Sequence, residues 1–128
     1  MKEGQTIGQW LNWDFETNGD LEIRDKNDNL IYFEDSTGYW DKHKYDSQGK
    51  LIYFEDSDGF WTKREYDSQG KLIYYEDSTG FWEKREWDSK GNQIYYETSN
   101  GIIEDHRPKP CENKVVEIDG VKYKLVKA

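Results

Sequence analysis

Residues 45–65 read YDSQGKLIYFEDSDGFWTKRE, and residues 66–86 read YDSQGKLIYYEDSTGFWEKRE. The second stretch differs from the first only at Tyr75, Thr79 and Glu83. More divergent copies precede and follow this pair, in residues 23–44 and 87–107, so the sequence repeats with a period of 21 residues. Self-similarity at a fixed period is typical of repeat architectures, in which each copy contributes one unit of structure to an array.

Each unit has the composition of two β-strands joined by tight turns. Residues 51–55 and 60–66 are rich in aromatic and β-branched side chains, which favour strands. Residues 56–59 and 67–70 begin with aspartate and end with glycine, the pattern of a type I turn. Strands joined this closely must be antiparallel neighbours. The sequence therefore predicts an all-β fold: an antiparallel meander of repeated hairpins that forms a thin, twisted or partly coiled sheet.

The odd period constrains the turns, because successive side chains of a strand point to opposite faces. Two three-residue turns with a glycine bulge would place equivalent residues of successive units on opposite faces. We therefore predict that one turn per unit is a two-residue primed turn, and Asp58-Gly59 and Asn100-Gly101 suit that type better than Gln69-Gly70. This choice groups the side chains of one unit into two faces, Leu51, Tyr53, Glu55, Phe60, Thr62, Arg64 and Tyr66 against Ile52, Phe54, Asp56, Trp61, Lys63, Glu65 and Asp67.

The two ends of the chain differ from the repeat. Residues 1–106 are predicted to form the array, and residues 1–23 to be a diverged cap with a hairpin signal at 17–19. Two prolines, Pro108 and Pro110, then interrupt the pattern. Residues 107–128 are basic and are predicted to form a C-terminal β-hairpin around Asp-Gly that packs on the array or extends it.

The charge of the chain narrows the choice of partner. The net charge is −9, with 35% charged and 16% aromatic residues. Such a field repels the phosphates of nucleic acids and favours a basic protein as partner, although it could equally serve solubility alone. The single cysteine, Cys111, excludes an internal disulfide. Without an apolar signal core or a run of about 20 apolar residues, the chain is expected to be cytoplasmic and not membrane-bound.

The unit resembles the tyrosine-aspartate (YD) repeat of the RHS and teneurin families. The resemblance covers roughly residues 24–107 and lies in Tyr-Asp at 45–46 and 66–67, an apolar strand, and Gly59 or Gly80 about seven residues before the next Tyr-Asp or Trp-Asp. RHS proteins form large β-shells around a toxin, which a chain of 128 residues is too short to build. In style the array is also similar to small acidic proteins of phages and mobile elements, which implies an inhibitor of a host protein.

The sequence offers little that could perform catalysis. The acidic run that starts at Asp25 begins like a calcium loop, but Leu30 stands where such a loop needs glycine and Ser36 where it needs glutamate. The two histidines, His43 and His106, do not form a zinc pattern with the lone cysteine. We therefore predict a protein that is not an enzyme and that uses no metal or cofactor.

Two repeated rows remain as candidate partner-binding residues. They are aspartates at strand ends and tryptophans at 21-residue spacing, namely Asp46, Asp56, Asp67, Asp77, Asp88, Trp40, Trp61 and Trp82. Turn capping and fold stabilisation would explain the same residues without any partner. If the aspartates bind, they predict a phage-type inhibitor that mimics nucleic acid in the groove of a basic host defence protein, such as a nuclease. The alternatives are a carbohydrate-binding module that uses the aromatic rows, or a structural protein that assembles through its sheet edges.

Overall fold

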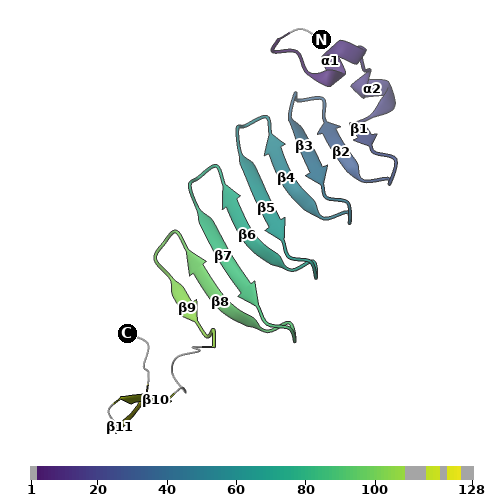
Figure 1. Cartoon of the computed structure of the whole chain (residues 1–128). Helices are drawn as coiled ribbons and strands as arrows, with labels where there is room; N and C mark the ends of the chain where they lie inside the picture. Colours follow the sequence, from purple (N-terminus) through teal and green to yellow (C-terminus); the bar gives the residue numbers. More distant parts are fainter. Residues whose placement is uncertain (1–2, 109–114, 119–120, 125–128) are drawn as a thin grey trace.

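The structure is a computed structural model that describes residues 3–108, 115–118 and 121–124, with side chains for residues 3–108. Its elements are α1 (Ile7–Leu11), α2 (Phe15–Asn18), β1 (Leu21–Arg24), β2 (Leu30–Glu34), β3 (Trp40–Tyr45), β4 (Leu51–Asp56), β5 (Trp61–Tyr66), β6 (Leu72–Asp77), β7 (Trp82–Trp87), β8 (Gln93–Thr98), β9 (Ile103–Asp105), β10 (Val115–Ile118) and β11 (Val121–Lys124). Strands β1 to β9 pair in chain order, each antiparallel to the next, in one sheet (Figure 1). The predicted all-β meander is confirmed.

The sheet is a single layer with very little apolar interior. The two short helices lie at its β1 end, and no other helix is present in the described residues (Figure 1). Leu21 and Tyr32, each 4% exposed, are the only buried hydrophobic residues in the described part of the chain. Most of the array is therefore held by backbone ladders and by side-chain pairs across neighbouring strands, which are the unit of sheet stabilisation.

Both turns of the unit have the same length. In the first, Gly59 N–H donates to Asp56 O (3.1 Å) and Asp56 N–H donates to Phe60 O (2.9 Å). The second repeats this pattern between Asp67 and Gly70. In both, glycine has a positive φ, 88° and 82°, which closes a three-residue loop with a glycine bulge. The predicted two-residue primed turn at Asp58-Gly59 is therefore wrong.

A β-bulge inside every second strand explains how an odd period of 21 residues can place equivalent side chains on the same face. Glu65 pairs with Tyr74 and Tyr66 with Leu72, so Ile73 has no partner across the ladder. The same irregularity leaves out the corresponding isoleucines of β2, β4 and β8, which are Ile31, Ile52 and Ile94. One residue per unit is thereby removed from the alternation, and equivalent side chains return to the same face.

This pairing also revises the predicted faces. Tyr53 pairs with Lys63 and Glu55 with Trp61, whereas Phe54 pairs with Thr62 on the other side. The prediction had grouped these side chains the other way, because a two-residue turn would shift β5 by one residue. We call the side that carries Trp40, Trp61 and Trp82 the tryptophan face. The opposite side, which carries Phe54 and Thr62, is the phenylalanine face.

Successive units are displaced along the strands. The ladders that join Tyr53 to Lys63 and Lys63 to Glu76 place Glu76, not the equivalent Tyr74, in the row of Tyr53. Each unit is therefore displaced from the preceding one by about 10 Å across the sheet and about 7 Å along the strands, so equivalent atoms of successive units lie roughly 12 Å apart. Figure 1 shows the resulting staircase of hairpins.

Hydrogen bonds between units fix this displacement. The hydroxyl of Tyr66 donates to Leu51 O on the neighbouring strand (2.7 Å), and the indole N–H of Trp87 donates to Leu72 O (2.8 Å). Leu51 and Leu72 immediately precede the bulged isoleucines. The aromatic residue of each Tyr-Asp or Trp-Asp pair thus satisfies a carbonyl next to the irregular part of the ladder.

The N-terminal cap is helical, so the predicted hairpin at residues 17–19 is wrong. Thr6 caps α1 in a capping box with Gln9, and Asp14 caps α2 by accepting from Thr17 N–H. A Thr-x-x-Gln spacing is a known helix-start signal. Helices of five and four residues are too short to show a hydrophobic periodicity in the sequence.

The predicted C-terminal hairpin is confirmed as an antiparallel pair. Strands β10 and β11 hydrogen-bond to each other in a two-stranded sheet of their own. The side chains of these strands, and residues 109–114 and 119–120, lie outside the described part of the chain. Packing of the hairpin on the array therefore stays a prediction.

The turn geometry predicts how substitutions at Gly59 change the stability of the protein. A Cβ added at Gly59 would meet no atom within 4 Å, so a substitution there strains only the backbone at φ 88°. We expect Gly59→Ala to lower the free energy of unfolding by about 1–2 kcal/mol, and Gly59→Asn to lower it by less, since asparagine tolerates this conformation. Urea unfolding followed by tryptophan fluorescence measures both. Equal stability of the wild type and Gly59→Ala would contradict the assigned turn.

Candidate functional site

The candidate aspartates lie in two rows of turns, at the two opposite ends of the strands. We refer to each row of turns as an edge of the array. Asp46, Asp67 and Asp88 begin the turns that follow β3, β5 and β7, whereas Asp56 and Asp77 end β4 and β6. Because strands of a meander alternate in direction, turns after odd and even strands lie at opposite edges (Figure 1). The five carboxylates do not form one continuous row.

Each of these aspartates serves its own turn. Asp67 Oδ1 accepts hydrogen bonds from the backbone N–H groups of Gln69 and Lys71, both at 2.9 Å. Asp46, Asp56 and Asp88 hold their turns with equivalent pairs of bonds. These contacts are those of an Asx turn. They explain why aspartate recurs at this position even in the absence of a partner.

Turn hydrogen bonds also keep several carboxylates ionised. The Thr79 hydroxyl and backbone donate to Asp77, and the hydrogen bond from the hydroxyl is the main cause that lowers the pKa of Asp77. Thr37 lowers the pKa of Asp35 in the same way. Hydrogen bonds of this kind favour the charged form of a carboxyl group.

The two edges differ in net charge, which sequence analysis missed. We call the turns of residues 35–39, 56–60 and 77–81 the acidic edge; they contain Asp35, Asp56, Asp58 and Asp77 and neither lysine nor arginine. On the opposite edge, aspartates alternate with lysines, namely Lys26, Lys50, Lys71 and Lys90. The signal was present in the sequence: one kind of turn is followed by lysine or asparagine, the other by tyrosine or phenylalanine.

The tryptophans form a regular column on one face. Trp40, Trp61 and Trp82 occupy the first position of β3, β5 and β7, and each is half-buried. The ammonium of the lysine two residues further along the strand lies over each ring, at 4.9 Å for Trp40 and 5.1 Å for the other two. This geometry is a cation–π contact that engages one side of each indole.

A buried carboxylate at the β1 end was not predicted from the sequence. Glu34 is 2% exposed and accepts hydrogen bonds from the Thr6 hydroxyl, Gly8 N–H and the Tyr32 hydroxyl, each at 2.8 Å. Burial, together with Glu34, raises the pKa of Tyr32, so that the phenol stays protonated and donates. The available signal was the Tyr-x-Glu triplet that recurs in every unit, as in Tyr32-Phe33-Glu34.

Histidine, cysteine and acidic side chains are the groups that could hold a metal ion. Among the described residues, no three His, Cys, Asp or Glu side chains come together in a way that could hold a metal ion. His43 lies beside Asp41, with Nε2 at 2.6 Å from Oδ1, and its ring packs edge-on against Phe54.

Comparisons with known proteins leave the family open. No protein-family model matches the sequence, and no curated protein is significantly similar to it. The resemblance to YD repeats therefore stays a prediction. Neither of the helices in the described residues has the length and apolar character needed to cross a bilayer.

The capping role of Asp67 can be measured directly. Asp67→Ala removes two backbone hydrogen bonds, each worth about 0.5–1.5 kcal/mol, and we expect a total loss of roughly 1–2 kcal/mol in the free energy of unfolding. Asp67→Asn retains the acceptor Oδ1 and should lose less than half of that. Ser68→Ala, at the neighbouring exposed turn position, is the control and should change stability by no more than about 0.5 kcal/mol. Equal losses for all three variants would contradict the capping role.

Stability should also fall in acid. The pKa values of Asp35 and Asp77 are lowered on folding, so below the ordinary value of 3.8 the unfolded chain binds protons that the folded chain does not. The stabilisation is complete above that pH and is lost as the pH falls through the lowered values. We expect the double variant Asp35→Asn/Asp77→Asn to lose less stability than the wild type between pH 6 and pH 2.5. Urea midpoints measured across this range test the difference, and parallel curves would contradict it.

Proposed function

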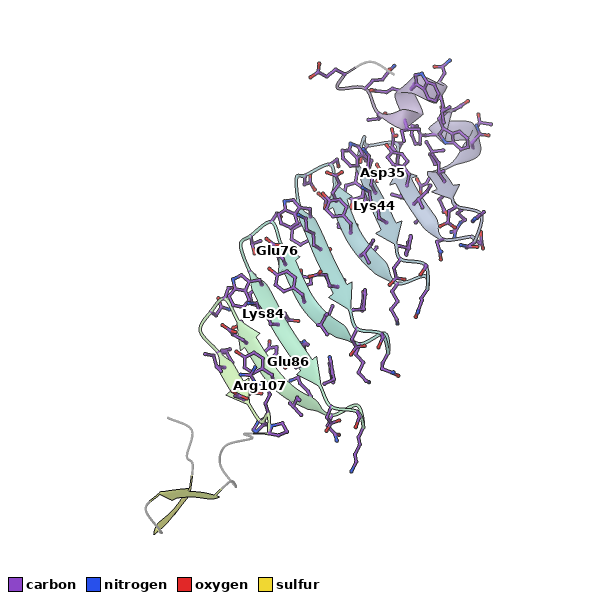
Figure 2. The ribbon with its side chains drawn as sticks, viewed as in Figure 1. Asp35, Lys44, Glu76, Lys84, Glu86 and Arg107 are labelled. Carbon is purple, nitrogen blue, oxygen red and sulfur yellow. The ribbon has the colours of Figure 1, made fainter. Side chains whose placement is uncertain are left out.

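We propose that this protein is a non-enzymatic binding protein whose acidic edge docks on the basic surface of another protein. One observation carries the proposal: the acidic edge repeats carboxylates at a spacing of roughly 12 Å with no lysine or arginine among them. Asp35, one of these residues, is labelled in Figure 2. Carboxylates that are not neutralised locally contribute their full field to an approaching cation.

The carboxylates are held in place before any partner arrives. Asp56 Oδ1 accepts from Asp58 N–H and Phe60 N–H, and Asp35 Oδ1 accepts from Thr37. Among the described residues, no hydrogen bond engages Oδ2 of Asp35 or of Asp56, so this oxygen can accept from a partner. Ordering side chains at an interface costs free energy, and side chains that are already ordered reduce that cost.

A protein that normally binds nucleic acid is the partner class that this edge favours. Such proteins present lysine and arginine in rows that follow a phosphate backbone. A rigid array of carboxylates, on a chain whose net charge is −9, offers them a similar pattern of negative charge, and the long-range field speeds association. An inhibitor of a host nuclease, as phages use, would fit this chemistry.

Carbohydrate binding has weaker support. Sugars stack on open aromatic faces, and a lysine ammonium already lies over one side of Trp40, Trp61 and Trp82. The function we propose therefore places the primary contact on the acidic edge.

Two charge-matched variants test the proposal. The first replaces the acidic-edge residues Asp35, Asp56, Asp58 and Asp77 by asparagine, and the second replaces Asp25, Asp46, Asp67 and Asp88 on the opposite edge. Each removes the same charge, and asparagine keeps the turn acceptor. Binding to a panel of purified basic nucleic-acid-binding proteins, measured at about 50 and 500 mM salt, should be lost in the first variant and at high salt.

The opposite-edge variant should bind within a few-fold of the wild type. Salt-insensitive binding, or equal loss in both variants, would contradict the assignment of the acidic edge. A panel in which no basic protein binds the wild type would count against the proposed function itself.

A further inference from the structure

The N-terminal segment shows how a protein chain docks on the tryptophan face. At the first unit, the Thr6 hydroxyl and Gly8 N–H both donate to the carboxylate of Glu34. Ile7, which lies between these two donors in the sequence, lines a pocket together with Tyr32 and Trp40. The first turn of α1 thus covers a pocket built from one Tyr-x-Glu strand and the tryptophan of the next strand.

Glycine is required in that docked segment. A Cβ on Gly8 would lie 2.6 Å from Glu34 Oε2 and 2.8 Å from its Cδ, closer than real atoms come. The carboxylate itself is held by Tyr32 and Thr6, so it has little freedom to give way. The pocket therefore selects a helix start with a hydroxyl at its cap and glycine two residues later.

The next two units repeat the pairs of the first unit with the following strand in the same register. Tyr32 pairs with Lys42 and Glu34 with Trp40 in the first unit. The equivalent pairs in the second and third units are Tyr53 with Lys63, Glu55 with Trp61, Tyr74 with Lys84 and Glu76 with Trp82. On the side of the preceding strand these two units are more polar, because Leu21 and Ile23 of the first unit are replaced by Lys42 and Lys44 in the second and by Lys63 and Glu65 in the third. The fourth unit departs from this pattern, because Ile103 and Asp105 stand in place of the tryptophan and the lysine.

Neither described helix covers the equivalent residues of the second and third units, because both helices lie at the β1 end (Figure 1). Glu55 and Glu76 are half-buried where Glu34 is fully buried. A hollow between the two units is lined in part by Tyr53, Tyr74 and Glu76, but not by Glu55 or the tryptophans. Figure 2 shows Glu76 and Lys84 on neighbouring strands, far along the sheet from α1.

We propose that the pockets around Glu55 and Glu76 bind a partner protein segment that begins a helix with Ser or Thr at the cap and Gly two residues later. The carboxylate accepts from the hydroxyl and from the glycine N–H, as Glu34 does within the chain. Hydrogen bonds to a charged acceptor are among the stronger ones in proteins. The tyrosine and tryptophan of each pocket supply the apolar contact for the residue between the two donors.

This surface borders the acidic edge, since Glu55 and Glu76 directly precede Asp56 and Asp77, but it uses different side chains. The pockets lie on one face of the sheet, whereas the acidic edge consists of turn residues. The inference does not require the function proposed above, and a protein with a neutralised acidic edge should bind the segment as the wild type does.

A peptide of residues 3–19 serves as the probe, because it contains the segment that contacts Glu34 in the structure. It is titrated to several millimolar into the ¹⁵N-labelled full chain, and the indole N–H signals of the tryptophans are followed by NMR. Signals of Trp61 and Trp82 should shift, while that of Trp40 should not, because α1 already covers its pocket.

Three matched changes decide the outcome. A peptide with Gly8→Ala should bind at least tenfold more weakly, and alanine favours helix, so lost helicity cannot explain the effect. The protein variant Glu55→Gln/Glu76→Gln should also lose at least tenfold, whereas Glu97→Gln in the fourth unit should bind as the wild type does. Urea unfolding confirms that each variant is folded.

Three results would overturn the proposal. The first is the absence of shifts at Trp61 and Trp82 at millimolar peptide. The second is equal binding of the Gly8→Ala peptide. The third is a shift confined to Trp40, which would mean that the peptide only exchanges with the protein's own N-terminal segment.

Discussion

A repeat of 21 residues is incompatible with an antiparallel sheet in which side chains alternate strictly between the two faces. Successive side chains point to opposite faces, so an odd step would place each unit in the environment that its neighbour avoids. The bulged isoleucine of each unit, such as Ile52 or Ile73, removes this conflict by leaving one residue out of the ladder. Every column on either face, including the tryptophans and the Tyr-x-Glu triplets, depends on that correction.

The bulge also explains why the tyrosine of each Tyr-Asp pair recurs. A bulge disrupts the ladder locally, and backbone groups left without partners are costly. Tyr66 donates to the carbonyl of Leu51 just before the bulge, and the aspartate that follows Tyr66 closes the next turn. Two adjacent residues thus stabilise the bulge and one of the two turns of the unit. In a single layer with so little buried apolar surface, such polar contacts have a larger share in setting the structure than they would in a thick core.

Much of this fold could be predicted from the sequence, and the failures have physical reasons. Strands and turns follow from composition and from the Asp and Gly positions, and the need to reset parity follows from the odd period. The position of the bulge could not be predicted. Ile73 looks like any other isoleucine in a strand, whereas Asp58-Gly59 matches a known turn type and therefore drew the prediction. The candidate aspartates were found, but their division between two edges requires the topology. Glu34 was missed because its burial depends on α1, a helix too short for periodicity to reveal.

The N-terminal cap connects the architecture of the array to its capacity for recognition. A terminal unit of a repeat protein has only one neighbour, and its exposed surface is usually covered by a specialised cap. Here the cap uses the glutamate of a Tyr-x-Glu triplet that occurs in every unit. The surroundings of the triplet differ, because Leu21 lies opposite Glu34 whereas Lys42 lies opposite Glu55. The covering segment differs as well, because the chain supplies it only once in its described part. The described chain therefore repeats the Tyr-x-Glu strand and its tryptophan partner in three units but supplies the covering helix start only at the first, and the binding proposed for Glu55 and Glu76 rests on this imbalance.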